Sequence, residues 1–218
     1  MDWDREARTG LPEAVFCAGK TPAQIDAILA EARAAGRRVL LTRLDPARRD
    51  ALAAKEGLDY DAASATAILG GPAPARPGRI AIVTGGLADL PAATEALRTL
   101  AFCGFAGELV ADVGVAGLWR LLERIDAIRE VDVVIAVAGM EGAIFSVLAG
   151  LVTAPIIALP VSFGSGVSAG GRLALDAALG SCAPGLVAVN IDNGFGAAQA
   201  AIRMLSPRGG TAQNAGPS

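Results

Sequence analysis

Cys182 is the first residue whose type and setting could do chemistry, because it stands in the stretch GSCAPG at residues 180–185. A thiolate is a good nucleophile and a good leaving group, so a cysteine can hold a substrate covalently for a time. The chain has no histidine, which excludes a Cys–His nucleophile pair. Cys182 must therefore be activated by its loop or by its substrate, or it is an inert small hydrophobic residue.

Three carboxylates stand just after stretches that are typical of strands, and each has a chemical and a structural interpretation. Glu141, in AGMEG, could act as a general base, or it could only favour the start of a helix through the helix dipole. Asp89, in LADLP, could contact a substrate or cap a helix. Asp192, in NIDNG, could do the same or only shape a turn.

The elements that must position these residues alternate strictly. The apolar runs RIAIVTGG, GELVADVG, DVVIAVAG, PIIALPVS and LVAVNID are separated by helical patterns. This alternation predicts right-handed βαβ units, and so an α/β fold with a doubly wound parallel sheet of about five strands, of flavodoxin-like type. In such a sheet the ligand lies beyond the carboxyl ends of the strands.

The loops at those carboxyl ends are rich in glycine, which lets a backbone approach a phosphate or a ring closely. Glycine also simply closes tight turns, but together the loops favour a nucleotide-sized ligand. TGG and GMEG match neither the Rossmann fingerprint nor the P-loop, and no metal-ligand cluster is present. The candidate substrate-binding residues are Thr84, Gly85, Gly86, Asp89, Asp112, Gly114, Gly139, Met140, Gly142, Ser162, Gly164, Asn190, Asp192 and Asn193.

Residues 1–75 are predicted to form a small α/β segment, and residues 76–205 the main α/β domain. GGPAPARPG, at 70–78, has the composition of a linker. Within the first segment, Thr21 and Pro22 predict the start of a helix and Gly36 its end. Asp45 and Pro46 start a second helical pattern that runs to Gly57, and DYDAASATAIL is expected to be extended. Residues 206–218 are predicted to be a disordered tail.

Composition bounds the partners and the setting. The net charge of −3 argues against a nucleic-acid surface, and three scattered cysteines fit a reducing cytoplasm. Residues 142–164 carry no charge over a length that could span a bilayer, but Pro155 and Pro160 favour a buried strand instead. Hydrophobic residues make up 53% of the chain, and EGAIFSVLAGLV is apolar nearly all round. Such surface needs cover, which predicts a homo-oligomer.

Several motifs carry a resemblance. The region from Arg79 to Leu205 resembles the PurE-type aminoimidazole ribonucleotide carboxylases, with TGGLADLP as the first phosphate-binding loop. The chain is more similar to the LarB family, the carboxylase/hydrolases of nickel-pincer nucleotide biosynthesis. That similarity lies in DVGVAGLWRLL, VVIAVAGMEGA, LPVSFGSGVSAGG, SCAPG, VNIDNGFGAA, DWDREARTGLPEAVFCAGKT and LLTR. PurE enzymes carry a catalytic histidine in the loop that is AGMEGAI here, so this chain departs from them at that step.

The resemblance implies carboxylation of the pyridinium ring of nicotinic acid adenine dinucleotide by carbon dioxide, with hydrolysis of the phosphoanhydride. Cys182 would form a transient adduct with the ring, and Glu141 would remove the ring proton. Asp89 would bind ribose or orient the substrate, and Thr84, Gly85 and Gly86 would donate to phosphate. No tightly bound cofactor is implied, although magnesium on the diphosphate is compatible with this chemistry. The octamers of PurE enzymes imply an octamer here.

Two alternatives stay open at this level. The first is a PurE-like carboxylase or mutase acting on aminoimidazole ribonucleotide, against which the missing histidine counts. The second is a nucleotide-binding domain without chemistry, in which Cys182 and Glu141 have only structural roles.

Overall fold

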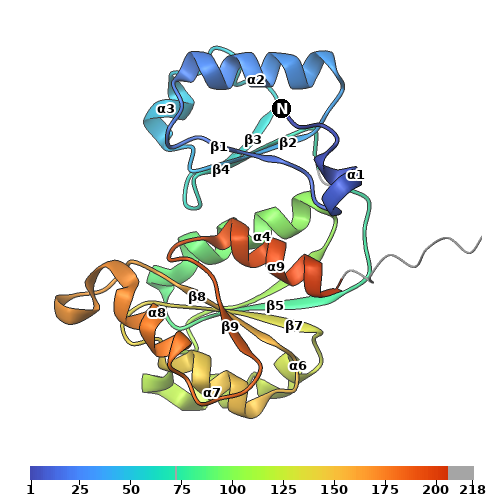
Figure 1. Cartoon of the computed structure of the whole chain (residues 1–218). Coiled ribbons are helices and arrows are strands. Elements are labelled where there is room, and N and C mark those ends of the chain that lie inside the picture. Colours follow the sequence, from blue (N-terminus) through green and yellow to red (C-terminus); the bar gives the residue numbers. More distant parts are fainter. Residues whose placement is uncertain (72, 206–218) are drawn as a thin grey trace, which may run out of the picture.

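The structure is a computed structural model that describes residues 1–71 and 73–205 (Figure 1). We call residues 1–71 the N-terminal unit and residues 73–205 the main unit. Each contains its own sheet, and the two units lie against each other. The segment 206–218, for which disorder was predicted, lies outside the described residues.

The main unit is built on a five-stranded, all-parallel sheet, as predicted. The strand order is β6-β5-β7-β8-β9. The central strands β7 and β8 are buried throughout, which explains their nearly uninterrupted apolar sequences. The strands are β5 (Arg79–Thr84), β6 (Ala106–Val110), β7 (Val133–Ala138), β8 (Ile156–Pro160) and β9 (Leu186–Ala188).

Helices cover both faces of this sheet. On the face toward the N-terminal unit lie α4 (Leu90–Phe102) and α9 (Gly194–Leu205). The opposite face carries α5 (Leu118–Leu122), α6 (Ile125–Arg129), α7 (Ala143–Leu151) and α8 (Arg172–Leu179). Three 3-10 turns complete the unit: η1 (Leu87–Asp89), η2 (Val115–Gly117) and η3 (Gly166–Gly171).

One of the helical patterns between the predicted strands, AGLWRLLERIDAIREV, was expected to form a single helix, and this was wrong in its continuity. The segment forms α5 and α6, because the backbone N–H of Arg124 turns back to the carbonyl of Leu121. Leu121, Ile125 and Ile128 are all buried, so the apolar spacing of a helix is kept across the break. These apolar side chains therefore pack into the same core as in one continuous helix, although the backbone breaks between α5 and α6.

The N-terminal unit has a mixed sheet in the order β1-β2-β4-β3. Thr21 and Gln24 form a capping box at the start of α2. The Thr21 hydroxyl accepts the backbone N–H of Gln24, and the Gln24 side-chain oxygen accepts the backbone N–H of Thr21. The helix expected from Asp45 to Gly57 ends already at Asp50, and the extended segment after it is a hairpin. The elements are α1 (Arg5–Thr9), β1 (Ala14–Phe16), α2 (Pro22–Ala34), β2 (Val39–Thr42), α3 (Pro46–Asp50), β3 (Leu58–Asp61) and β4 (Thr66–Leu69).

The contact between the units is both apolar and polar. Leu11, Leu40 and Ile68 of the N-terminal unit belong to the same hydrophobic cluster as α4 and α9. Arg38 donates to the carbonyl of Phe102 at 2.8 Å, and Arg98 of α4 donates to Thr66 Oγ1 at 2.7 Å. The N-terminal unit is therefore tied to the helical layer that covers the main sheet.

The uncharged segment 142–164 folds into α7 and β8 of the main unit. In residues 1–71 and 73–205, no helix is long and apolar enough to cross a membrane.

Candidate active site

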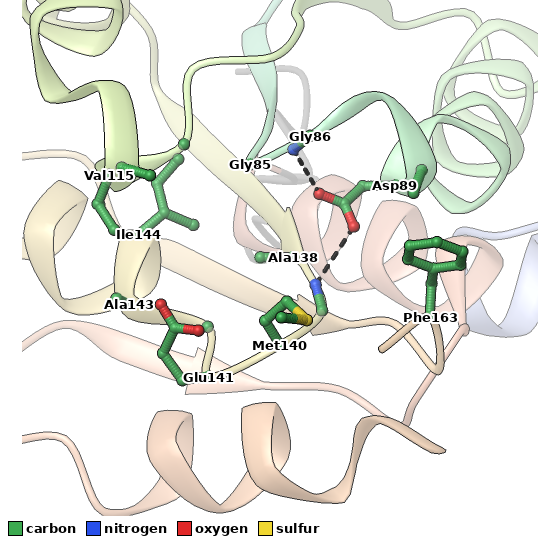
Figure 2. Close-up of a pocket in the computed structure, with 15 residues that line it drawn as sticks. Gly85, Gly86, Asp89, Val115, Ala138, Met140, Glu141, Ala143, Ile144 and Phe163 are labelled. Carbon is green, nitrogen blue, oxygen red and sulfur yellow. Dashed lines mark hydrogen bonds between the residues drawn. The ribbon is translucent and has the colours of Figure 1, made fainter. Parts of the chain in front are cut away.

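One pocket of the main unit lies where the strand order reverses. β5 is followed by β6 on one side and then by β7 on the other, so the crevice beyond their carboxyl ends is the topological switch point. A cavity of about 340 Å³ opens there, and we call it the switch-point pocket (Figure 2). It is lined by Gly85, Gly86, Ala88, Asp89, Gly114, Val115, Ala116, Ala138, Gly139, Met140, Glu141, Gly142, Ala143, Ile144 and Phe163. Eight of the sequence candidates are among these residues.

Asp89 joins the two loops that form this pocket. Its Oδ2 accepts the backbone N–H of Gly86 at 2.7 Å, and its Oδ1 accepts that of Gly139 at 3.2 Å (Figure 2). The side chain is buried, with 5% exposed. Burial raises the pKa of the Asp89 carboxyl, although the backbone N–H donors act in the opposite direction. Asp89 thus holds the loops after β5 and β7 together.

Glu141 and Met140 lie across the pocket from Asp89 (Figure 2). Met140 has φ of 52°, a left-handed conformation that is uncommon for a residue with a side chain. Gly142, with φ of 62°, is the N-cap residue that precedes α7. Glu141 therefore sits in a tight turn at the helix start, exposed, with its carboxylate at the cavity rather than in the core.

Two glycines of the pocket are required by loop packing. A Cβ at Gly114 would lie 2.4 Å from the carbonyl oxygen of Gly85. A Cβ at Gly139 would lie 2.1 Å from the carbonyl oxygen of Phe163. The loops after adjacent strands thus touch backbone to backbone, and this close approach gives these glycines a role that does not depend on a ligand.

Thr84 and Asp112, two predicted binding residues, lie beside the pocket but do not line it. Thr84 is fully buried, and its hydroxyl accepts the backbone N–H of Asp112 at 3.0 Å. Asp112 has φ of 58°, and its carboxylate pairs with Arg120. The structure therefore gives the Thr84 hydroxyl a backbone N–H donor in the neighbouring loop, and its predicted contact with phosphate stays a prediction.

A second group of candidates lies outside the switch-point pocket. Asp192 has φ of 57°, and its Oδ1 accepts the backbone N–H of Ser162 at 2.8 Å. Asn190 and Asn193 stand in the same loop after β9. These residues line cavities between the two units, described below. Gly164 lines none of these cavities, and its hydrogen faces the carbonyl of Ser168.

Cys182 does not line the switch-point pocket that Glu141 lines. It lies exposed in the loop between α8 and β9, and that loop leads into the amino end of a strand. Its neighbour Ser181 contacts Ser146 on α7, with 2.7 Å between the two hydroxyl oxygens. Cys182 therefore stays a predicted catalytic residue whose side chain lies outside the switch-point pocket of its own chain.

Sequence reasoning missed several residues at these cavities. Phe163 is 66% exposed and lines the switch-point pocket. It stands in the loop 161–171, which was singled out for its glycines rather than for its aromatic residue. Arg43 and Glu95 line the cavities between the units. Arg43 follows β2, so the strand-end rule that was applied to the main unit would have found it in the N-terminal unit too.

No metal site is evident among the residues that the structure describes, since no three Cys, Asp or Glu side chains gather there in a way that could hold an ion. The polar groups of the switch-point pocket are instead backbone amides and the carboxylates of Asp89 and Glu141.

Comparison with known proteins places this geometry in a family. Residues 1–70 match the LarB/PurE-like N-terminal domain, and residues 79–214 match AIR carboxylase. An uncharacterized protein of Methanocaldococcus jannaschii is 44% identical over 122 residues, which are 55% of this chain and 46% of that protein. The aligned region thus spans about half the length of this relative. With its parallel sheet, its pocket at the switch point and its matching N-terminal unit, the chain belongs to the AIR carboxylase family, as a LarB-like member of the PurE superfamily.

Proposed function

We propose that this protein carboxylates the pyridinium ring of nicotinic acid adenine dinucleotide and hydrolyses its phosphoanhydride. The products would be pyridinium-3,5-biscarboxylic acid mononucleotide and AMP, in the synthesis of the nickel-pincer nucleotide. The family supports a carboxylase-type function. The observation that carries the proposal further is the carboxylate of Glu141 at a largely apolar pocket that could enclose a flat ring.

The chemistry needs a nucleophile that can leave again. A pyridinium ring is electron-poor and cannot attack carbon dioxide. Addition of the Cys182 thiolate to a ring carbon would convert it to a dihydropyridine, whose enamine carbon can form the new C–C bond to carbon dioxide. Loss of the proton from that carbon, followed by departure of the thiolate, restores the aromatic ring. The step is balanced, because one ring C–H becomes C–COO⁻ and one proton is released.

Glu141 is the proposed base for that proton. It lines the pocket, and no residue among those described donates a hydrogen bond to its carboxylate or pairs with it. Asp89 is less suited to the task, because both of its oxygens accept backbone N–H groups and the side chain is buried. The two carboxylates therefore take different roles, with Asp89 holding the loops and Glu141 moving the proton.

Cys182 would have to reach the ring from outside the pocket of its own chain. We propose that a second copy of the chain supplies it, in a homo-oligomer whose sites form where subunits meet. The exposed position of Cys182 is compatible with this arrangement. Magnesium, where present, would arrive on the diphosphate as part of the substrate.

The test is product analysis. Purified protein is mixed with nicotinic acid adenine dinucleotide and ¹³C-bicarbonate, and small molecules and intact protein are followed by mass spectrometry. We expect a mononucleotide that carries one labelled carboxylate, AMP in equal amount, and a transient protein adduct. Aminoimidazole ribonucleotide is assayed in parallel. Turnover of that substrate alone would favour the purine-pathway activity and overturn this proposal.

A further inference from the structure

The two units enclose a groove that continues the switch-point pocket. Ala88 and Phe163 line both that pocket and a neighbouring cavity of about 320 Å³. Arg43, Glu95 and Asp192 line this second cavity and a third one of about 490 Å³. We call the second and third cavities together the inter-unit groove. The shared lining residues form a path from the proposed ring site to the surface of the N-terminal unit.

Arg43 crosses this groove from the N-terminal unit. Its Nη2 donates to the carbonyl of Asp192 and lies 3.5 Å from Glu95 Oε2. Among the residues that the structure describes, its Nε and Nη1 have no hydrogen-bond partner. Arg43 also has φ of 55°, so the chain keeps a side chain at a backbone position that glycine would adopt more easily. The three N–H groups on these two guanidinium nitrogens are thus free to bind a phosphate.

The opposite wall carries groups that suit hydroxyls and a base. Asp192 uses Oδ1 for Ser162, and its Oδ2 has no partner among the described residues. Asn190 and Asn193 use their carbonyl oxygens for backbone N–H groups, so each side-chain NH₂ is available to a ligand. A carboxylate next to neutral amides disfavours a bare inorganic anion and favours a ligand with hydroxyl groups, as a ribose has.

An aromatic side chain completes the third cavity. Phe16, in β1, is 58% exposed although it is large and apolar. An exposed aromatic face beside polar donors is a platform on which a nucleobase can stack. Phe16, Arg43 and Asp192 therefore offer separate contacts for a base, a phosphate and a ribose.

We propose that the inter-unit groove binds the adenylate half of the dinucleotide, with Phe16 against the adenine and Arg43 on the phosphate. This inference rests on the proposed function, because it places the leaving AMP of that reaction. It gives the N-terminal unit a direct part in substrate binding, in addition to packing on α4 and α9.

The experiment measures the two halves of the substrate separately by calorimetry on the full chain. AMP and nicotinic acid mononucleotide are titrated alone and together into the wild type, Phe16→Ala and Arg43→Gln. Arg37→Gln is the matched control, because Arg37 is exposed in the same unit and lines neither the pocket nor the groove. Phe16→Ala is included because it should fold normally even if Arg43→Gln does not, since an exposed side chain contributes little to stability.

We expect wild type to bind both ligands at once. Phe16→Ala and Arg43→Gln should weaken AMP roughly tenfold or more and change mononucleotide affinity less than twofold, while Arg37→Gln changes neither. No AMP binding to the wild type, competition between the two ligands, or unchanged AMP affinity in both groove variants would overturn the inference. Wild type that turns over the dinucleotide while both groove variants bind AMP normally would reject the groove and keep the function. AMP binding that the groove variants weaken, in a protein that does not turn over the dinucleotide, would keep the groove and reject the proposed function.

Discussion

Arg43 and Glu95 form an ion pair that joins the two units, with 3.5 Å between Nη2 and Oε2. Glu95 lies on α4 and is buried, and it also accepts the backbone N–H of Gly194 at 3.1 Å. Burial raises the pKa of the Glu95 carboxyl, and Arg43 lowers it in part. The pair therefore links the N-terminal unit, α4 and the first residue of α9 through the buried carboxylate of Glu95.

Arg43→Gln should destabilise the protein in a pH-dependent way. The folded-state pKa of Glu95 is raised, so the folded state binds the proton more tightly than the unfolded state. The free energy of unfolding therefore falls as the pH rises from the pKa that Glu95 has in the unfolded chain to the higher pKa that it has in the folded protein. Loss of Arg43 raises the folded pKa further and extends that fall toward neutral pH. We expect a loss of about 1–3 kcal/mol near pH 8 and a smaller loss near pH 5.

Urea unfolding at the two pH values measures this difference. The double variant Arg43→Gln/Glu95→Gln should regain most of the stability at the higher pH, since no charge is then buried without a partner. An equal loss at both pH values would show that Glu95 does not need the arginine.

Glu141→Gln should slow carboxylation by roughly two to four orders of magnitude, because the amide keeps the shape of the side chain and removes the base. Formation of the cysteinyl adduct should survive, and loss of the ring proton should become rate-limiting. Single-turnover kinetics with substrate deuterated at the reacting carbon checks this through an increased isotope effect. A loss of activity below about threefold would mean that Glu141 only favours the start of α7.

Cys182→Ala and Cys182→Ser should keep the fold and dinucleotide binding but lose carboxylation. Cys17→Ala and Cys103→Ala should remain active, because both of these thiols are buried in hydrophobic clusters. Circular dichroism, calorimetry and the ¹³C assay separate folding, binding and chemistry. Carboxylated product from Cys182→Ala at close to the wild-type rate would remove the covalent step.

Alkylation should distinguish the three thiols without any substrate. Burial raises the pKa of both Cys17 and Cys103 to about 11, so near pH 8 they stay protonated as well as covered. Cys182 is exposed in a single chain. Iodoacetamide near pH 8 should therefore modify Cys182 first, as peptide mass mapping would show. Protection of Cys182 by the dinucleotide is expected if the thiol lies at the substrate in the assembled protein, and modification of Cys17 before Cys182 would contradict the burial argument.

The protein should assemble as a homo-oligomer, and we expect an octamer. Trp119 on α5 is 63% exposed and Leu179 on α8 is 68% exposed, both on the side of the sheet away from the N-terminal unit. Exposed apolar residues on one side of a domain are typical of an interface. Light scattering should give about eight times the 21.9 kDa of the chain. Trp119→Glu should lower that mass, whereas Met204→Glu, on α9 of the other face, should not. An active monomer would contradict this prediction.

The sequence predicted the main sheet well because its central strands β7 and β8 are buried on both faces. Runs such as VVIAVA cannot be mistaken for amphipathic helix, and a glycine directly follows β5 and β7. The strand-end rule also placed Asp89, Met140 and Glu141 at one pocket. The break between α5 and α6 was missed, because Leu121, Ile125 and Ile128 keep the spacing of one continuous helix.

What could not be predicted depends on contacts between segments far apart in the chain. Neither the pairing of Arg43 with Glu95 nor the burial of Thr84 under its loop has a local signal. The five non-glycine residues with positive φ among those described show the same limit. Four of them line the switch-point pocket or the inter-unit groove: Arg43, Ala65, Met140 and Asp192. The fifth, Asp112, lies beside the pocket, where its backbone N–H donates to the Thr84 hydroxyl. Tertiary packing imposes these conformations, so residue type alone does not reveal them.

The backbone contacts at Gly114 and Gly139 have a consequence for anyone who wishes to re-engineer substrate choice. Each loop of the switch-point pocket rests on the main chain of its neighbour, so lengthening one would push another aside. Grafting loops from a relative one at a time should therefore fail, whereas exchanging the whole set together could succeed. The positions best suited to variation are exposed side chains that face the cavity, such as Ala88 and Phe163. A library built at those positions would alter the shape of the pocket without disturbing its frame.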